Sequence, residues 1–207
     1  MSRSPDTGRD TTALLSEVLR RFWWPVYCEV RRRGHDPAES RHLTSVVLSR
    51  AADGHSFFRT DDFGGRLRQV VRNELLNVIS NPDRIQLTPT QPAVTASETE
   101  PREGYDPGLV DDPFNRCWGI VILEQALESL REDCRNQGTL EAMKRLEPFL
   151  GRRVPDSLEV DIENSASHSE VDNLRDRFRD FVRQHVAETV TTPLALEAEL
   201  AELFGAP

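Results

Sequence analysis

The chain has 207 residues, of which 37% are apolar and 29% are charged, and its formal net charge at pH 7 is −9. Its mean hydropathy is −0.54, and no stretch approaches the roughly 18 consecutive apolar residues of a membrane span. The first ten residues, MSRSPDTGRD, lack the apolar core of a signal peptide. We therefore expect one large or two small globular domains, no membrane association and a cytoplasmic location.

The negative charge is unevenly distributed along the chain. Residues 1–84 carry 14 arginines against 11 acidic residues, whereas residues 85–113 carry one arginine against six acidic residues. Residues 114–207 carry 11 basic against 18 acidic residues. The N-terminal part can therefore meet a polyanion, whereas the C-terminal part has no net attraction to one.

The cysteines and histidines predict neither a disulfide framework nor a metal site. Cys28, Cys117 and Cys134 are odd in number, well separated and form no CxxC pair. We expect them to be buried thiols in a reducing compartment. The five histidines show no ligand spacing, so we expect no metal.

The strongest local signal is a helix, a tight corner and a second helix. Pro25 suits the first position of a helix over 25–33, because its missing N–H is not needed there. Gly34 can take the left-handed conformation that ends this helix. Asp36 is then a suitable N-cap for a helix over 37–52.

Apolar residues at helical spacing predict two further helices in the first half of the chain. One begins at Asp10 or Thr11, and the other runs from Phe63 to just before Pro82. The aromatic residues near the first corner are expected in the core; they are Phe22, Trp23, Trp24 and Tyr27. Four helices with short connections predict a compact bundle.

A change of composition then marks a boundary. Six of the thirteen prolines fall in residues 82–113, among Thr, Ser, Gln and Glu. Such a segment cannot bury enough apolar surface to order itself, so it predicts a flexible linker. Its acidity suits either a soluble spacer or a segment that threads a positively charged channel.

Helical spacing resumes after the linker. The expected helices cover residues 114–136, 139–150 and 171–189, with a last one that begins at Pro193. Four apolar residues are expected to fold this last helix back onto the others: Leu196, Leu200, Leu203 and Phe204. The sequence has no alternating strand pattern of useful length, and we predict an all-α fold. The expected parts are a disordered N-terminus (1–10), a helical bundle (11–81), a linker (82–113) and a second helical domain (114–207).

Several stretches, in this order and at this spacing, resemble the two-domain extracytoplasmic-function sigma factors of bacterial RNA polymerase. RRFWWPVYCEVRRRGHDPAESRHLTSVVLSR looks like the start of the first conserved domain, and GGRLRQVVRNELLNVI is similar to its last helix. WGIVILEQALESLREDC and LEAMKRLEPFL look like the opening helices of the second domain. LRDRFRDFVRQHVAETVTTPLALEAELAELF is similar to its recognition helix and tail.

The resemblance implies a transcription initiation protein that is not an enzyme and needs no cofactor. Its implied partners are core RNA polymerase and promoter DNA, with an anti-sigma regulator as a further candidate, and no small-molecule substrate. The N-terminal bundle would contact the polymerase clamp and the promoter −10 region. A helix-turn-helix in the second domain would read the −35 region.

The chain departs from the family pattern at two places. The helix that usually carries an acidic clamp-docking signature ending in glutamine reads AESRHLTSVVL here. The expected helix-turn-helix lacks a glycine in its turn, and its second helix alternates acids with arginines, which weakens attraction to phosphates. The main alternative is therefore a sigma-like interaction or regulatory protein that does not read promoters.

The resemblance assigns roles to three groups of residues. The −10 group consists of Arg66, Arg68, Arg72, Asn73 and Asn77, where Arg would hold phosphate and Asn would bind bases. The polymerase-docking group consists of Glu39, His42, Leu43, Thr44 and Val47. The −35 group consists of His168, Arg175, Arg177, Arg179 and Arg183.

Each group also has a purely structural interpretation. The −10 group can be an ordinary solvated helix face, and Leu43 and Val47 can be core residues. The arginines of the −35 group can pair along their own helix with Asp172, Asp176 and Asp180. A metal-dependent nuclease cluster of Asp61, Asp62 and Glu74 is the weakest alternative, because no further ligand is spaced to join it.

Overall fold

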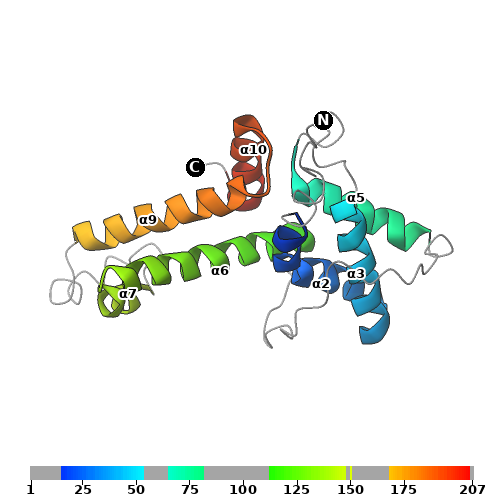
Figure 1. The fold of residues 1–207 in the computed structure, drawn as a ribbon, viewed down its shortest axis with the longest axis horizontal. Coiled ribbons are helices and arrows are strands. Elements are labelled where there is room, and N and C mark those ends of the chain that lie inside the picture. Colours follow the sequence, from blue (N-terminus) through cyan, green and yellow to red (C-terminus); the bar gives the residue numbers. More distant parts are fainter. Residues whose placement is uncertain (1–14, 54–64, 82–111, 148–149, 151–167, 206–207) are drawn as a thin grey trace, which may run out of the picture. The chain divides into compact units, whose positions relative to one another are not determined.

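The computed structural model describes residues 15–53, 65–81, 112–147, 150 and 168–205. Its helices include α2 (Trp23–Arg32), α3 (Pro37–Asp53), α5 (Leu67–Ser80), α6 (Pro113–Asn136), α7 (Leu140–Leu146), α9 (His168–Ala187) and α10 (Pro193–Phe204) (Figure 1). A helical stretch over 15–21 precedes α2. Within the described residues the only β-pairing is one isolated bridge, which confirms the all-α prediction. None of the described helices is long and apolar enough to cross a membrane.

The chain divides into two compact units that differ from the ranges predicted above. Unit 1 comprises Met1–Val121 and Ala187–Pro207, and unit 2 comprises Ile122–Val186. The first residues of α6 and the whole C-terminal segment therefore belong with the N-terminal helices. The predicted linker lies outside the described residues except for its last two, and its last residue already begins α6.

Local signals placed the first corner correctly. The Asp36 carboxylate accepts a hydrogen bond from the Glu39 backbone N–H at 2.8 Å, so it caps α3 as predicted. Gly34 has φ +95°, the left-handed conformation expected after α2. Helix α2 begins two residues before the predicted start, and Pro25 is therefore inside its first turn. That position is still tolerated, because the N–H groups of the first turn have no helical partner.

Aromatic residues explain why the start of α6 belongs to unit 1. The rings of Phe22 and Trp118 stack with centroids 3.8 Å apart and planes at 7°. Trp118 is fully buried and Phe22 is almost so. Trp23 also stacks on Tyr27 within α2. The aromatic cluster expected in the core is largely there, with Trp24 half-buried, and α3 packs against both α2 and α5.

Unit 2 has a small core of its own. Leu130 and Cys134 of α6 pack with Met143 of α7 and Leu174 of α9, all buried. Helix α9 runs alongside α6 within this unit (Figure 1). The three cysteines are free, with Cys117 and Cys134 buried and Cys28 half-buried. A hydrogen bond with Cys117, together with burial, raises the pKa of the Cys28 thiol.

Candidate nucleic-acid interface

Helix α5 and the residue before it carry the arginines of the predicted −10 group. Arg66 precedes the helix in an extended conformation, φ −113° and ψ 116°. Residues 67, 70, 71, 75 and 78 form the buried stripe of α5 against unit 1. The structure brings Arg66, Arg68 and Arg72 together at the N-terminal end of α5, and each of them pairs with a carboxylate.

Arg68 is buried rather than solvated. Its Nε and Nη2 atoms donate to the two carboxylate oxygens of Glu199 on α10, at 2.6 and 2.9 Å. Nη2 also lies 2.8 Å from a carboxylate oxygen of Glu202, and Nη1 donates to the side-chain oxygen of Asn115. Arg68 and Glu199 are each 0% exposed. The solvated-face interpretation is therefore wrong for Arg68, whose guanidinium is fully occupied inside the molecule.

Carboxylates control the ionisation of this cluster. Burial acts to lower the pKa of Arg68, but hydrogen bonds and charge attraction from Glu199 and Glu202 raise it overall. Burial likewise acts to raise the pKa of Glu202, and the guanidinium groups of Arg68 and Arg66 lower it overall. Both shifts favour the charged forms of Arg68 and Glu202, so the contact between them is charge-assisted.

The other two arginines are paired at more accessible positions. Arg66 donates to Glu202 at 2.6 Å and lies 3.8 Å from Glu199; its own side chain is 25% exposed. Arg72, which is 39% exposed, pairs with Asp112 just before α6. These two guanidinium groups can reach solvent, so an external anion can compete for them.

The asparagines of the group lie further along α5. Asn73 is half-buried, and Asn77 is exposed. The backbone oxygen of Asn77 accepts a hydrogen bond from the Asn81 side chain at 3.3 Å. Asn77 is therefore accessible to solvent on the helix that carries Arg68 and Arg72.

A backbone contact fixes the C-terminal segment beside the start of α5. The Leu67 N–H donates to the Thr189 oxygen, and the Thr191 N–H donates to the Gly65 oxygen, each at 2.9 Å. Gly65 has φ +69°, and a Cβ there would lie 1.9 Å from the Thr191 hydroxyl oxygen. Only glycine fits this position without strain.

The docking group on α3 is divided by burial. Glu39 and His42 are exposed, whereas Leu43, Thr44 and Val47 are buried. The Thr44 hydroxyl donates to the Ser40 backbone oxygen at 2.7 Å inside the helix. Leu43, Thr44 and Val47 are therefore core residues of this chain, and only Glu39 and His42 of the docking group are accessible to a partner.

The −35 group lies on α9 in unit 2, where its arginines pair mostly with nearby acids. Arg175 lies 3.3 Å from Asp172 and Arg179 lies 2.8 Å from Asp176, each one helical turn apart. Arg183 is exposed. His168 is the first residue of α9, and its side chain lies outside the described residues. The local-pairing interpretation thus describes Arg175 and Arg179.

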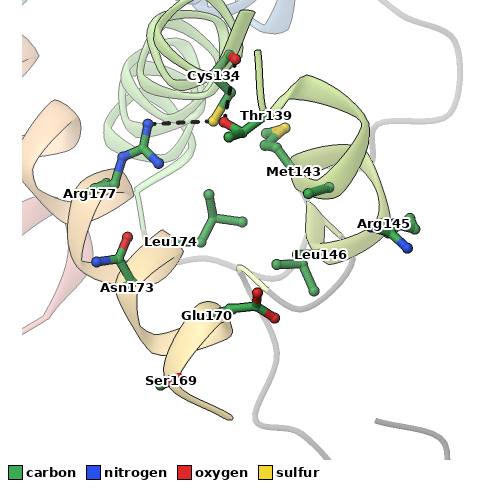
Figure 2. A pocket seen from close by; sticks show the side chains of 11 residues that line it. Cys134, Thr139, Met143, Arg145, Leu146, Ser169, Glu170, Asn173, Leu174 and Arg177 are labelled. Atoms are coloured by element: carbon green, nitrogen blue, oxygen red, sulfur yellow. Dashed lines mark hydrogen bonds between the residues drawn. The ribbon is translucent and has the colours of Figure 1, made fainter. Parts of the chain in front are cut away.

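Arg177 of this group instead points into unit 2. It contacts Asp133 of α6 at 2.5 Å, which is the main reason that its pKa is raised. It also donates to the Cys134 sulfur at 3.5 Å, beside a hollow of about 470 Å³ between α6, α7 and α9 (Figure 2). Met143 and Leu174 line this hollow and also belong to the unit 2 core.

The described residues contain no group of three His, Cys, Asp or Glu side chains that could hold a metal ion. Asp61 and Asp62 of the nuclease alternative lie outside them, whereas Glu74 is half-buried on α5.

Comparisons with protein-family models, curated proteins and solved structures find no match for this chain.

Sequence reasoning missed the acids that hold α5. Glu199 and Glu202 are three residues apart on one face of α10, and Asp112 directly precedes α6. The spacing of the two glutamates was a readable signal, since an acidic pair three apart can face basic residues on a neighbouring helix. Their partners are 131 or more residues away in sequence, however, and nothing local identifies them.

Proposed function

We propose that this chain is a sigma-factor-like transcription initiation protein that docks on core RNA polymerase and directs it to promoters. The observation that carries the proposal is the anion-accepting face of α5, where Arg66, Arg68 and Arg72 each hold a carboxylate. Arginine forks that hold carboxylates also suit the oxygens of DNA phosphates. The exposed Asn77 on the same helix adds a side chain that can bind base edges or an unpaired base.

The proposed roles of the other two groups follow the sequence resemblance. Glu39 and His42 are exposed on α3 and form the accessible part of the polymerase-docking face. On α9, Arg179 and Arg183 are exposed and would meet DNA near −35. The two docking residues of α3 and the two arginines of α9 are all exposed. A protein partner or a DNA backbone can therefore reach their side chains.

The alternative is a sigma-like regulatory protein that binds polymerase or a regulator without reading promoters. One observation favours it: Arg175 and Arg179 pair with acids of their own helix. Acids beside the arginines repel the phosphates that the arginines would attract, so fewer counterions would be released when DNA binds.

In vitro transcription tests the proposal directly. The full chain is mixed with core polymerase of its own source and sheared genomic DNA, and the transcript 5′ ends are mapped. We expect new start sites that share upstream sequence. The Asn73→Ala/Asn77→Ala variant should lose them, whereas Arg20→Gln, at an exposed position outside the three groups, should keep them. Co-purification with polymerase without new transcripts would support the alternative. If the chain neither produced new transcripts nor co-purified with polymerase, the proposal and the alternative would both be contradicted.

A further inference from the structure

Arg66, directly before α5, and the two arginines of α5 are all occupied by acids from distant segments of the same chain. The pairs are Arg66 with Glu202, Arg68 with Glu199 and Arg72 with Asp112. The carboxylates come from α10 and from the residue before α6, between 40 and 136 positions away in sequence. Local helix pairing cannot produce this arrangement, because it joins residues only three or four apart.

These carboxylates lie where phosphates would have to lie. A guanidinium has a fixed set of N–H donors and offers the same planar fork to a carboxylate and to a phosphate. Glu199 holds Arg68 at 2.6 and 2.9 Å, Glu202 lies 2.8 Å from its Nη2, and Asn115 accepts from its Nη1. While these partners are in place, a phosphate cannot bind the same guanidinium. Helix α10 therefore presents negative charge to α5 in the manner expected of a nucleic-acid backbone.

We infer that the C-terminal segment Ala187–Phe204 is an internal acidic occupant of the α5 face, and that DNA gains this face only when the segment moves away. The inference rests on the proposed function, since it names what regulates the same site. Competition between the internal carboxylates and DNA phosphates sets the fraction of protein molecules in which the α5 face is free to contact a promoter.

The apolar attachment of α10 is slight enough to permit this exchange. On α10 only Ala195 and Glu199 are buried, and Leu194 is 82% exposed. The four apolar residues expected to fold the helix back are less enclosed than predicted: Leu196, Leu200 and Leu203 are half-buried, and Phe204 is exposed over Gly119. The ion pairs and the short backbone bridge therefore carry much of the attachment. An incoming phosphate can replace a departing carboxylate, so the arginine need not be left without an anion.

The bridge between Arg66 and Val190 offers a way to lock the segment. Its two flanking hydrogen bonds make these residues a non-hydrogen-bonded antiparallel pair, for which the Cα separation is about 4.5 Å. That separation fits a disulfide. In the full-length Arg66→Cys/Val190→Cys variant, oxidation should hold the C-terminal segment in place, and reduction should release it. The reduced form is the matched control for the missing arginine.

The measurement is fluorescence anisotropy of a labelled 30-base-pair DNA with an unpaired T-rich centre. We expect the oxidised variant to bind at least about tenfold more weakly than the reduced variant, because the disulfide prevents the C-terminal segment from leaving the α5 face. Wild-type protein taken through the same oxidation should bind unchanged. Mass spectrometry establishes that the engineered bond has formed.

A second pair of variants needs no disulfide. Glu202→Gln removes a carboxylate that holds Arg66 and Arg68, and Glu197→Gln makes the same charge change on the exposed side of α10. We expect Glu202→Gln to bind the same DNA about threefold more tightly than Glu197→Gln. Equal affinities of these two variants, or of the oxidised and reduced forms, with DNA binding otherwise intact, would overturn the inference alone. No DNA binding by any form would overturn the proposed function and this inference together.

Discussion

Helices α5 and α9 both carry arginines paired with acids, but the two sets of pairs differ in kind. On α9, Arg179 and Asp176 are 74% and 71% exposed and belong to the same helix. On α5, Arg68 and Glu199 are both fully buried and lie 131 residues apart in sequence. An exposed local pair contributes about 0–1 kcal/mol, whereas breaking a buried pair costs about 3–5 kcal/mol. The same residue types therefore contribute little to stability on the surface of α9, whereas on α5 they attach the helix to a distant part of the chain.

The largest effect is expected from breaking the buried pair. Glu199→Ala leaves the Arg68 guanidinium buried without its main partner, and we expect the free energy of unfolding to fall by about 3–5 kcal/mol. Urea denaturation followed by circular dichroism measures this. The Arg68→Met/Glu199→Leu variant should recover most of the loss, because it removes both charges together. If both variants were destabilised equally, the ion pair would not be the cause.

A smaller loss is expected at the backbone bridge. Gly65→Ala places a methyl group where φ is +69° and against the Thr191 hydroxyl, and we expect it to cost about 1–3 kcal/mol. Thermal unfolding gives the change. Gly138→Ala is a matched control: it has φ +71° but no atom near its Cβ, so it should cost less. An equal loss of stability at both positions would mean that backbone strain alone, and not the clash with Thr191, causes the effect.

Acid should loosen the C-terminal segment. The pKa of Glu202 is lowered in the folded chain, so its contribution to stability is present above the ordinary glutamate value of 4.5 and is lost as the pH falls through the lowered pKa. We expect hydrogen exchange of the Leu67 and Thr191 amides, compared at matched intrinsic rates, to lose protection over this range. The Glu202→Gln variant should show a weaker change there. An identical profile in both proteins would rule out Glu202 as the titrating group.

The smallest effect is expected on α9. Arg179→Ala removes an exposed local pair, and the free energy of unfolding should change by less than about 1 kcal/mol. Arg177→Ala is the informative neighbour, since Arg177 contacts Asp133 and is only 27% exposed, and it should cost more. Equal small changes at both positions would mean that unit 2 does not depend on the contact between α6 and α9.

The sequence predicted the parts of the fold that depend on nearby residues. Asp36 caps the backbone of a residue three positions on, and the Thr192 hydroxyl likewise accepts from the Ala195 N–H at 3.1 Å, so each helix start is specified locally. Pro193 begins α10 as expected. Such signals need no knowledge of the tertiary structure.

What the sequence did not reveal depends on distant partners. Arg68 was expected on a solvated face, yet it is buried because Glu199 neutralises it. Trp118 was assigned to the second domain, yet it stacks on Phe22 in unit 1. Hydrophobic spacing identifies which residues share a helix face, but it does not identify the surface that the face meets. Neither the division into two units nor the pairing of the arginines could therefore be predicted, because both depend on contacts between residues far apart in the sequence.

The salt dependence of DNA binding tests most directly whether α5 is the nucleic-acid face. The same labelled DNA is titrated with the full-length wild type, Arg72→Gln and Arg179→Gln at several salt concentrations. Removal of one arginine that binds a phosphate should reduce the slope of log K against log salt by about 1. We predict this reduction for Arg72→Gln and a smaller one for Arg179→Gln, because the acids that alternate with the arginines of α9 repel the phosphates that Arg179 would attract. An unchanged slope for Arg72→Gln would contradict the account.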